Sequence, residues 1–473
     1  MEERLRTKVV VTIGPATESE EMINTLVEEG VDVFRLNFSH GSPAGHFSTI
    51  EKIRKCEKEK GKYISILQDL QGPKIRLGTI NGGRVLLKEG ADFVLTKHEI
   101  AGDDKICSIS DGEVIDDVKI GEPVYIDDGL IKLRVKRKDK DSILTEVIEG
   151  GFISDRKGVN FPQTLLSLPA ITEKDRNDLK LGIEKGVDFV ALSFVRNAGD
   201  IISLRDFMNR FGRVVPIIAK IEKWEAVKNI EGIVEEADGV MVARGDLGVE
   251  LPLEEVPIIQ KHITHICNSM GKPVIIATQM LNSMIEHPIP TRAEVNDISN
   301  AILDGSDALM LSNETAIGKF PLESVKTMKR VILTTEGSDL FRLSIEGYGK
   351  SLDNSIPDAI AFSVKSMAIE VGAKLIITAT ESGKTANLVS KYKPPVPILA
   401  MTPNKETLSY LNLKWGVYPV IVKRFKSVDE ILYEAPRIAL WEKIISKGDL
   451  YIITAGFQTG VSGSTNLIKI DRA

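Results

Sequence analysis

The sequence is poor in several features that mark specialised classes of protein. Its three cysteines, Cys56, Cys107 and Cys267, lie far apart and show no metal-ligand spacing. This excludes a disulfide scaffold and favours a reducing compartment, the cytoplasm. No apolar run approaches the roughly 20 residues that a membrane span requires. Residues 1–7 also lack the apolar core of a signal peptide, so we expect no membrane partner.

Aromatic residues and excess positive charge are also scarce. Aromatic side chains make up 5% of the chain, which is poor for sugar-binding platforms, and the formal net charge is -6, which disfavours nucleic acid as a partner. The six histidines form no HExxH pattern. With 42% hydrophobic and 27% charged residues, the composition is that of an ordinary globular protein, and 473 residues predict several domains.

Continuous apolar strands alternate with amphipathic helices along most of the chain, which predicts parallel βα units. Three strands come first, at residues 7–13, 31–39 and 63–70, and five more follow, at 189–194, 215–222, 239–243, 274–278 and 308–311. Eight units of roughly 240 to 260 residues in total predict a (β/α)8 TIM barrel. A doubly wound sheet is the weaker alternative, because nothing marks a reversal of strand order.

Two further regions lie outside these eight βα units: one interrupts the series and one follows it. Residues 72–168 contain short alternating runs and glycine-rich turns, which predict a small inserted β-barrel domain. Residues 341–473 predict a smaller α/β domain with a helix at 356–371 and strands at 375–378, 398–401, 450–454 and 467–470. The expected domains are therefore 1–71 and 169–340 for the barrel, 72–168 for the insertion, and 341–473 for the C-terminal domain.

One strand ends in a pair of opposite charges. In Ile217-Ile-Ala-Lys-Ile-Glu-Lys, residues Lys220 and Glu222 are two apart, so they project from the same side of the strand. Such a pair suits a phosphate held on a divalent metal, with the carboxylate on the metal and the ammonium on the phosphoryl oxygens. A structural ion pair on a barrel rim is the alternative, and this stretch alone does not decide between them.

Polar residues gather at six strand ends, which in a parallel barrel meet on one catalytic face. Alternation points Arg35, Asn37 and Ser39 of the second strand the same way. The other ends carry Gln68 and Asp69, Lys220 and Glu222, Arg244 to Asp246, Thr278 and Gln279, and Ser312 to Thr315. This convergence indicates a functional site.

The carboxylates of Glu222 and Asp246 follow adjacent strands and can meet, which describes a Mg²⁺ or Mn²⁺ site. A glycosidase pair is disfavoured, because Lys220 would lie between the carboxylates. Because Gly245 has no side chain, the backbone there can approach a ligand closely. The helical turn that follows offers free N–H groups to an anion, and the planar guanidinium of Arg35 supplies a fixed positive charge.

Several motifs resemble those of the pyruvate kinase family, in the right order and over essentially the whole chain. They are Arg35-Leu-Asn-Phe-Ser-His-Gly, Lys157-Gly-Val-Asn, Leu168-Pro-Ala-Ile-Thr-Glu-Lys-Asp, Ile217-Ile-Ala-Lys-Ile-Glu-Lys, Ala243-Arg-Gly-Asp-Leu-Gly-Val-Glu and Ala277-Thr-Gln-Met. The resemblance implies a barrel, an inserted lid and a C-terminal domain. It also implies Mg²⁺-dependent phosphoryl transfer from phosphoenolpyruvate to ADP, giving pyruvate and ATP, by a cytoplasmic homotetramer.

The resemblance implies a role for each matching residue. Glu222 and Asp246 bind the metal, Lys220 stabilises the phosphoryl group in flight, and Arg35 contacts its oxygens. The substrate contacts are Arg35, Lys220, Gly245, Asp246 and Thr278, while Thr278 and Ser312 lie where the enolate is protonated through water. The nucleotide contacts are Asn37, Ser39, His40, Arg76 and Lys157; solvated hinge charges are the alternative for the last two.

One segment departs from many family members, which bind K⁺ through the equivalents of Asn37, Ser39, Asp69 and the carbonyl of residue 70. Those members carry Thr-Lys at 70–71 and Glu at 74, whereas this chain has Leu70, Gln71 and Lys74. An ammonium here replaces the charge balance that glutamate and K⁺ supply, so we expect activity without K⁺. A tolerated surface substitution is the alternative.

The C-terminal domain holds a second candidate for phosphate binding. Thr380, Ser382, Gly383, Lys384 and Thr385 follow a strand and open a helix, although Thr378 rules out a Walker A loop. In the family, this loop and a late Gly/Ser loop, residues 456–466 here, bind a phosphorylated allosteric effector, either a sugar phosphate or AMP. An ordinary capped turn is the alternative.

Two rival functions remain from the sequence. One is another Mg²⁺-dependent barrel enzyme acting on pyruvate or phosphoenolpyruvate, an aldolase or mutase, which explains neither Lys220 nor the insertion. The other is a non-catalytic regulatory homologue, which the intact Lys220, Glu222, Asp246 and Thr278 argue against.

The Lys74 substitution gives a direct prediction about monovalent cations. In tetramethylammonium buffer, pyruvate formation from phosphoenolpyruvate and ADP proceeds at full rate, because the Lys74 ammonium already supplies the positive charge. The measurement is the rate before and after adding K⁺. A large increase with K⁺ would sink this expectation.

Overall fold

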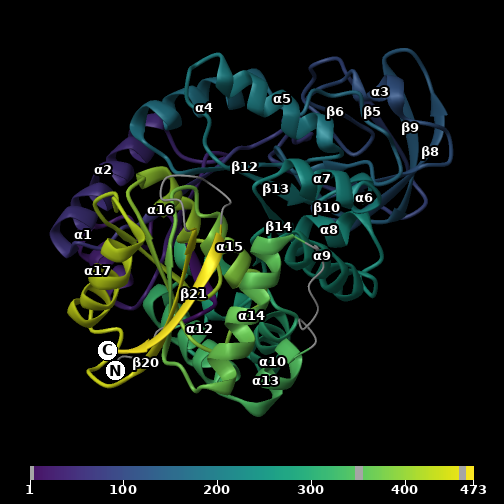
Figure 1. The fold of residues 1–473 in the computed structure, drawn as a ribbon. Coiled ribbons are helices and arrows are strands. Elements are labelled where there is room, and N and C mark those ends of the chain that lie inside the picture. The colour runs from purple at the N-terminus through teal and green to yellow at the C-terminus, as the bar shows by residue number, and fades with distance from the viewer. Residues whose placement is uncertain (1–4, 347–354, 457–464) are drawn as a thin grey trace.

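Eight parallel strands form a closed barrel in the order β1-β16-β15-β14-β13-β12-β3-β2. The computed structural model describes residues 5–346, 355–456 and 465–473. The barrel strands are β1 (Lys8–Ile13), β2 (Val33–Asn37), β3 (Ser65–Asp69), β12 (Phe189–Leu192), β13 (Ile217–Ile221), β14 (Gly239–Ala243), β15 (Val274–Ala277) and β16 (Ala308–Leu311). The pairing of β1 with β16, Lys8 opposite Ala308, closes the ring. The predicted (β/α)8 barrel is confirmed (Figure 1).

Helices surround the strands and bury an apolar stripe against them. They are α1 (Glu20–Glu28), α2 (Pro43–Lys60), α4 (Glu173–Lys185), α5 (Ala198–Asn209), α6 (Trp224–Lys228), α7 (Ile230–Glu236), α8 (Arg244–Glu250), α9 (Val256–Met270), η1 (Asn282–Ile285), α10 (Arg292–Leu303), α11 (Asn313–Ala316), α12 (Pro321–Glu336) and α13 (Asp339–Glu346). Thr172 caps α4 in a capping box with Asp175. No helix among the described residues is long and apolar enough to cross a membrane.

The inserted domain lies to one side of the barrel mouth, at the upper right of Figure 1. A six-stranded sheet runs in the order β11-β7-β8-β9-β5-β6, beside a β10-β4 pair. Its elements are β4 (Arg84–Leu87), β5 (Asp92–Thr96), β6 (Ile106–Ser108), α3 (Val114–Asp117), β7 (Pro123–Ile126), β8 (Ile131–Lys138), β9 (Ser142–Glu149), β10 (Gly151–Ser154) and β11 (Val159–Asn160). The sequence indicated strands alone, so the short α3 is a correction. The domain has an apolar core of its own.

The C-terminal domain is a five-stranded sheet with helices, in the order β19-β18-β17-β20-β21. Its elements are α14 (Ile356–Glu370), β17 (Leu375–Ala379), α15 (Lys384–Lys391), β18 (Ile398–Thr402), α16 (Lys405–Leu411), β19 (Val417–Ile421), α17 (Val428–Trp441), β20 (Leu450–Gly456) and β21 (Thr465–Arg472). Strand β19 was not predicted, because Pro419 argues against a strand. An edge position tolerates proline, and β19 is an edge strand.

The segment that follows α16 closes the barrel floor, by which we mean the N-terminal ends of the barrel strands. Leu413 packs into the barrel interior with Val10, Phe189 and Met241, so the C-terminal domain completes a core layer of the barrel. Aspartates precede four of the strands: Asp32, Asp188, Asp238 and Asp307. Each of these aspartates has a hydrogen bond or an ion pair with a residue of the C-terminal domain.

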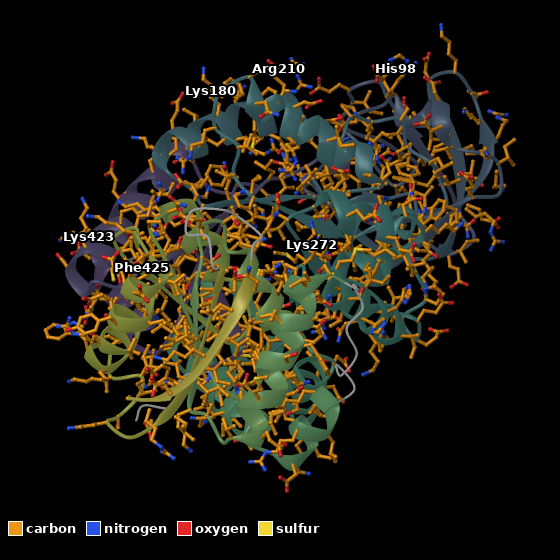
Figure 2. The ribbon with its side chains drawn as sticks, in the orientation of Figure 1. His98, Lys180, Arg210, Lys272, Lys423 and Phe425 are labelled. Atoms are coloured by element: carbon orange, nitrogen blue, oxygen red, sulfur yellow. The ribbon has the colours of Figure 1, made fainter. Side chains whose placement is uncertain are left out.

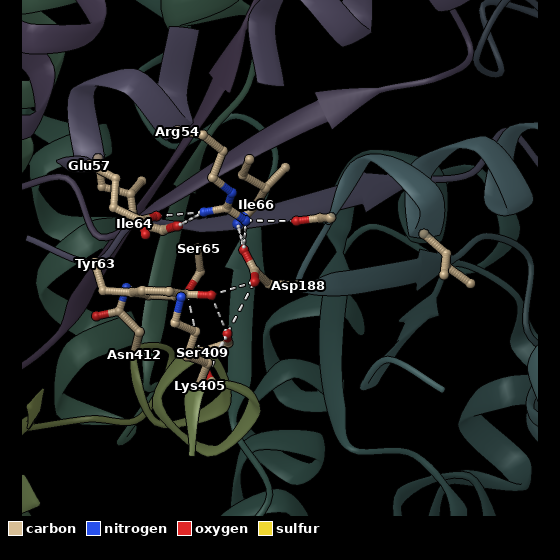
Figure 3. Close-up of polar contacts among 12 residues, drawn as sticks. Arg54, Glu57, Tyr63, Ile64, Ser65, Ile66, Asp188, Lys405, Ser409 and Asn412 are labelled. Atoms are coloured by element: carbon tan, nitrogen blue, oxygen red, sulfur yellow. Dashed lines mark hydrogen bonds and ion pairs between the residues drawn. The ribbon is translucent and has the colours of Figure 1, made fainter. Parts of the chain in front are cut away.

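The Asp188 carboxylate shows how this floor is held together (Figure 3). Arg54 Nη2 lies 2.5 Å from Asp188 Oδ2, and Tyr63 donates its hydroxyl to Oδ1 at 2.7 Å. From the C-terminal domain, Ser409 Oγ donates to the same Oδ1 at 3.0 Å. The carboxylate therefore joins α2, the barrel and α16 through charge-assisted hydrogen bonds in a buried site.

Lys414 is a buried cation at the same floor. Its Nζ donates to the carbonyl of Gly271 at 2.6 Å, and the side chain is almost fully buried. Burial lowers the pKa of Lys414 to about 7, although Asp307 opposes the shift, and Lys393 and Lys272 add to it. The folded protein therefore holds this lysine largely neutral above pH 7.

Lys414 gives a prediction about stability and pH. Between about pH 7 and the ordinary lysine pKa of 10.5, the unfolded chain binds a proton at Lys414 that the folded chain lacks, so this lysine makes stability rise with pH in that window. Lys414→Met removes this pH-dependent contribution to the free energy of unfolding. The variant's gain in stability from pH 7 to pH 9 is then smaller than that of the original chain by about 2 kcal/mol.

The measurement is thermal unfolding of both chains at the two pH values. Lys447→Met, at an exposed lysine of the same domain, is the control and keeps the original pH dependence. An unchanged pH dependence in Lys414→Met would contradict a neutral buried lysine.

Candidate active site at the C-terminal strand ends

Lys220, the last-but-one residue of β13, lies among three acceptors at the barrel mouth. Its Nζ is 2.8 Å from Glu222 Oε1, 3.3 Å from Asp69 Oδ1 and 2.7 Å from Ser193 Oγ. Burial lowers the pKa of Lys220, but Asp69 and Glu222 outweigh burial and hold it above the ordinary lysine value. Lys220 is therefore a permanently charged ammonium at the centre of the site.

Asp69 separates two cations. Arg35 Nε donates to Asp69 Oδ2 at 2.6 Å, while Oδ1 faces Lys220. Burial favours the neutral acid, yet Lys220 and Arg35 together hold the pKa of Asp69 below its usual value. Arg35 also donates through Nη1 to Thr12 Oγ1 at 3.0 Å, which fixes the guanidinium over β1. The arrangement keeps two positive groups side by side, as binding of a phosphoryl group requires.

Glu222 and Asp246 were predicted to lie close enough to share a metal. Burial raises the pKa of Glu222, and the nearby Asp246 charge adds to the rise against the effect of Lys220. The effect of Asp246 on the pKa of Glu222 means that the two carboxylates interact electrostatically. No cluster of three or more His, Cys, Asp and Glu suitable for a metal occurs among the described residues. Two carboxylates fit Mg²⁺, which usually takes one or two from protein and the rest from water and substrate.

Thr278 has an unusual backbone. Its φ is +68° and that of Gln279 is +56°, a left-handed conformation that is costly for a β-branched residue. Arg244 holds the turn, because Nη2 donates to the Thr278 carbonyl at 2.8 Å and Nη1 to Asp297 at 2.7 Å. The Gly245 N–H donates to Thr278 Oγ1 at 2.8 Å, so this donor is already satisfied and does not count among the N–H groups offered to an anion.

The buried Ser312 Oγ has no hydrogen-bond partner among the described residues. The N–H of Ser312 donates to Glu314 Oε2 at 2.7 Å. Glu314 also accepts the Leu281 N–H at 3.0 Å, so one carboxylate ties the ends of β15 and β16 together. A buried hydroxyl left free in this way suits a group that awaits a ligand or water.

Positive charge continues from the barrel mouth toward the inserted domain. Burial lowers the pKa of His40, and Arg76, Lys74, Arg35 and Lys174 lower it further, so all four cations lie within reach of this ring. Lys157 is less central, because its Nζ pairs with Asp127 of the inserted domain at 2.8 Å. Of the predicted nucleotide contacts, the structure therefore places His40 and Arg76 together in this cationic region. His98, by contrast, lies at the outer edge of the inserted domain (Figure 2).

Two details of the predicted strand ends were wrong. Strand β2 ends at Asn37, so Ser39 lies in the following turn, where its N–H donates to Asn37 Oδ1 at 3.1 Å. Gln68 does not face the mouth, because its Nε2 donates to the Asp178 carbonyl of α4 at 2.7 Å. The strand before Ser39 is shorter than predicted, and Gln68 lies on the face of β3 opposite Asp69, as alternation requires.

The departure at Lys74 has a definite place in the site. Lys74 Nζ is 3.7 Å from Asp246 Oδ1, and the Leu70 carbonyl accepts the Ser193 hydroxyl at 2.7 Å. The lysine therefore adds its charge beside the second candidate metal carboxylate. Asp69, for its part, is already balanced by Arg35 and Lys220.

The phosphate candidate in the C-terminal domain opens α15, with Gly383 at φ +81° as its N-cap. Thr385 Oγ1 lies 2.7 Å from Thr465 Oγ1, and the Glu381 carbonyl accepts from Asn404 and Thr407 at 2.8 Å. Thr380 is buried. The predicted late loop, residues 456–466, lies largely outside the described residues, which omit 457–464.

Sequence reasoning missed several residues that hold this site. Thr12, Ser193 and Phe194 were not singled out, although the last two follow β12 directly. Arg244 was named only as a polar residue at a strand end, without its role in holding the Thr278 turn. Ser193 and Thr12 carried none, because buried hydroxyls are common in barrel strands.

Comparison with known proteins decides the family. The model of the pyruvate kinase barrel domain matches residues 4–325, and that of the pyruvate kinase alpha/beta domain matches residues 358–471. The chain belongs to the pyruvate kinase family. The chain is 45% identical over 468 residues to a pyruvate kinase of Sporosarcina psychrophila and 46% identical over 468 residues to one of Geobacillus stearothermophilus. One from Staphylococcus aureus strain MRSA252 is 44% identical over 467 residues. Each alignment covers 98% of this chain and 80% of the relative.

Proposed function

We propose that this chain transfers the phosphoryl group of phosphoenolpyruvate to ADP and produces pyruvate and ATP. The observation that carries the proposal is the Lys220 ammonium, held 2.8 Å from Glu222 and 3.3 Å from Asp69, with Arg35 on the far side of Asp69. Two fixed cations beside two carboxylates suit a phosphoryl group with developing negative charge. Membership of the pyruvate kinase family supports the same reaction.

Each site residue has a proposed role that follows from its position. Lys220 stabilises the phosphoryl group in flight, and Arg35 binds its oxygens. Gly245 and Thr278 face the substrate carboxylate, and the left-handed Thr278 is held by Arg244 for this purpose. The free Ser312 hydroxyl and Thr278 orient a water that protonates the enolate, since neither hydroxyl is acidic enough to do so alone.

A divalent cation belongs to this proposal. Glu222 and Asp246 would hold Mg²⁺ or Mn²⁺, which neutralises charge on the substrate carboxylate and phosphate when bound. The buried Glu222 and the more exposed Asp246 fit such an ion, because one ligand is fixed and the other side stays open to water and substrate.

The inserted domain serves as a lid in the proposed division of the chain, with boundaries at 71/72, 168/169 and 340/341. Supporting this, Arg76 pairs with Gly158 in an isolated bridge, so the outgoing and returning segments of the insertion run side by side. The nucleotide then lies between Asn37, Ser39 and His40 of the barrel and Arg76 and Lys157 of the insertion.

Activity without K⁺ is part of the proposal. The Lys74 ammonium near Asp246, together with the two cations on Asp69, supplies positive charge around the phosphate-binding region without a monovalent ion. The K⁺-site equivalents in this chain are Asn37, Ser39, Asp69, Leu70 and Lys74.

Regulation and assembly rest on the family resemblance. We propose a cytoplasmic homotetramer whose α15 loop, Thr380 to Thr385, binds a phosphorylated effector, either a sugar phosphate or AMP. The glycine N-cap of α15 supports the loop as an anion site, because its first N–H groups have no side-chain cap.

Two alternatives give different results in one assay. An aldolase or mutase would consume phosphoenolpyruvate or pyruvate without making ATP, and a non-catalytic homologue would do neither. Coupled measurement of pyruvate and ATP from phosphoenolpyruvate and ADP therefore separates all three functions.

Removing the central ammonium gives the sharpest test of the site. Lys220→Ala lowers kcat by at least about 100-fold, because a preorganised charge that faces the transferring group is lost. Mn²⁺ binding is kept, since Glu222 and Asp246 remain. Lys228→Ala, at an exposed lysine of the neighbouring α6, is the control and keeps its activity. Full activity in Lys220→Ala would refute the assigned role.

The effector loop has its own test. Titration with fructose 1,6-bisphosphate, ribose 5-phosphate, glucose 6-phosphate or AMP shifts the phosphoenolpyruvate saturation curve if the loop is regulatory. Lys384→Ala abolishes that shift without changing the basal rate, because Lys384 lies in the C-terminal domain. If none of these compounds moves the curve, the loop is an ordinary capped turn.

A further inference from the structure

The turn that follows β12 contacts both charged groups of the central pair. Strand β12 lies between β3 and β13, so the two residues after it, Ser193 and Phe194, stand between the ends of these neighbours. Ser193 accepts a hydrogen bond from Lys220 Nζ at 2.7 Å. The Phe194 N–H donates to Glu222 Oε2 at 2.8 Å. One short turn thus holds the ammonium and the carboxylate of the site.

The Ser193 hydroxyl has a preferred orientation. A serine hydroxyl has a single proton, and its shorter contact is with the Leu70 carbonyl at 2.7 Å, against 3.5 Å to Asp69 Oδ1. The oxygen therefore presents lone pairs to Lys220, and the serine is 2% exposed, so water does not compete. If Glu222 held a metal, Ser193 and Asp69 would still accept from the Lys220 ammonium.

Phe194 adopts a strained backbone. Its φ is +54°, in the left-handed region where a bulky residue is a clear outlier. Such strain persists only where the surrounding structure enforces it, and it gathers at functional sites. In this conformation the N–H reaches Glu222 Oε2. Of the described carboxylates near the mouth, Glu222 is the one that this backbone donor contacts.

Gly72 packs directly against the same turn. A Cβ on Gly72 would lie 2.8 Å from Phe194 Cδ2 and 3.0 Å from Ser193 Cβ, which is too close for an undisturbed turn. Gly72 has φ +68° and stands two residues after Leu70, where the chain leaves the barrel for the inserted domain. Its lack of a side chain allows the turn to approach β3.

We propose that Ser193 and Phe194 form a positioning turn, in which the Ser193 hydroxyl orients Lys220 and the Phe194 N–H orients Glu222 for phosphoryl transfer. The inference rests on the proposed function, since it assigns both residues to that reaction. Neither residue need touch the substrate; each acts through the side chain that it holds.

Ser193 is tested with a matched serine. Ser193→Ala lowers kcat by about 10- to 100-fold, the range expected for losing a hydrogen bond to a charged group, while KM for phosphoenolpyruvate changes less than about threefold. Ser306 is also fully buried and donates to a carbonyl, that of Ala301 at 2.7 Å, but it lies at the barrel floor. Ser306→Ala costs similar stability and keeps kcat. Equal kcat in the two variants would overturn the role of Ser193.

The turn as a whole is tested with matched glycines and without turnover. Gly72→Ala displaces Phe194 and raises the Kd for Mn²⁺, measured by calorimetry without substrates, by about fivefold or more, because Glu222 loses a fixed donor. Gly61, which ends α2 at φ +62° with nothing within 4 Å of its Cβ position, carries the same backbone strain without the contact. Gly61→Ala leaves Mn²⁺ binding unchanged.

Two outcomes separate this inference from the function on which it rests. Equal Mn²⁺ affinity in Gly72→Ala and Gly61→Ala would overturn the role of Phe194, whatever the enzyme does with phosphoenolpyruvate. Absence of pyruvate and ATP formation by the original chain would instead remove the proposed function and, with it, the catalytic purpose of the turn.

Discussion

The buried carboxylate of Asp69 holds together the charged groups of the candidate active site. Arg35 and Lys220 both approach it, one at each oxygen, at 2.6 and 3.3 Å. Without this anion the two cations would repel each other in a medium of low dielectric constant. With it, they stay side by side and charged. The rest of the site follows this arrangement, since Thr12 fixes the arginine, and Ser193 and Glu222 share the lysine.

Much of this arrangement was predictable from the sequence, because two simple periodicities encode it. Apolar strands and amphipathic helices gave the eight-strand barrel, and the spacing of Lys220 and Glu222 placed both at one strand end. Prediction failed where the sequence leaves no periodic signal. Backbone donors such as the Phe194 N–H have no side-chain code, and the hydrogen bond between Gly245 and Thr278 depends on a left-handed turn. Strand β19 was missed because its proline is acceptable only at a sheet edge.

Lys220 and Glu222 form an ion pair at 2.8 Å, which was the structural alternative for this strand end. Yet neither belongs to the other alone, because Lys220 also faces Asp69 and Ser193, and Glu222 also accepts from Phe194 and lies in the field of Asp246. The pair is therefore a resting arrangement inside a larger network of charges.

The contact of Leu413 with the barrel interior has a consequence for how the chain is made. The ribosome delivers all eight barrel strands before it delivers residue 413, and β1 must wait for β16 before the ring closes. During that interval the lower layer of the barrel lacks its last apolar side chain, and Asp188 and Asp307 lack partners from α16 and its neighbours. Until the C-terminal domain emerges, the nascent barrel therefore lacks the side chains that cover its floor, and apolar surface there stays exposed to chaperones.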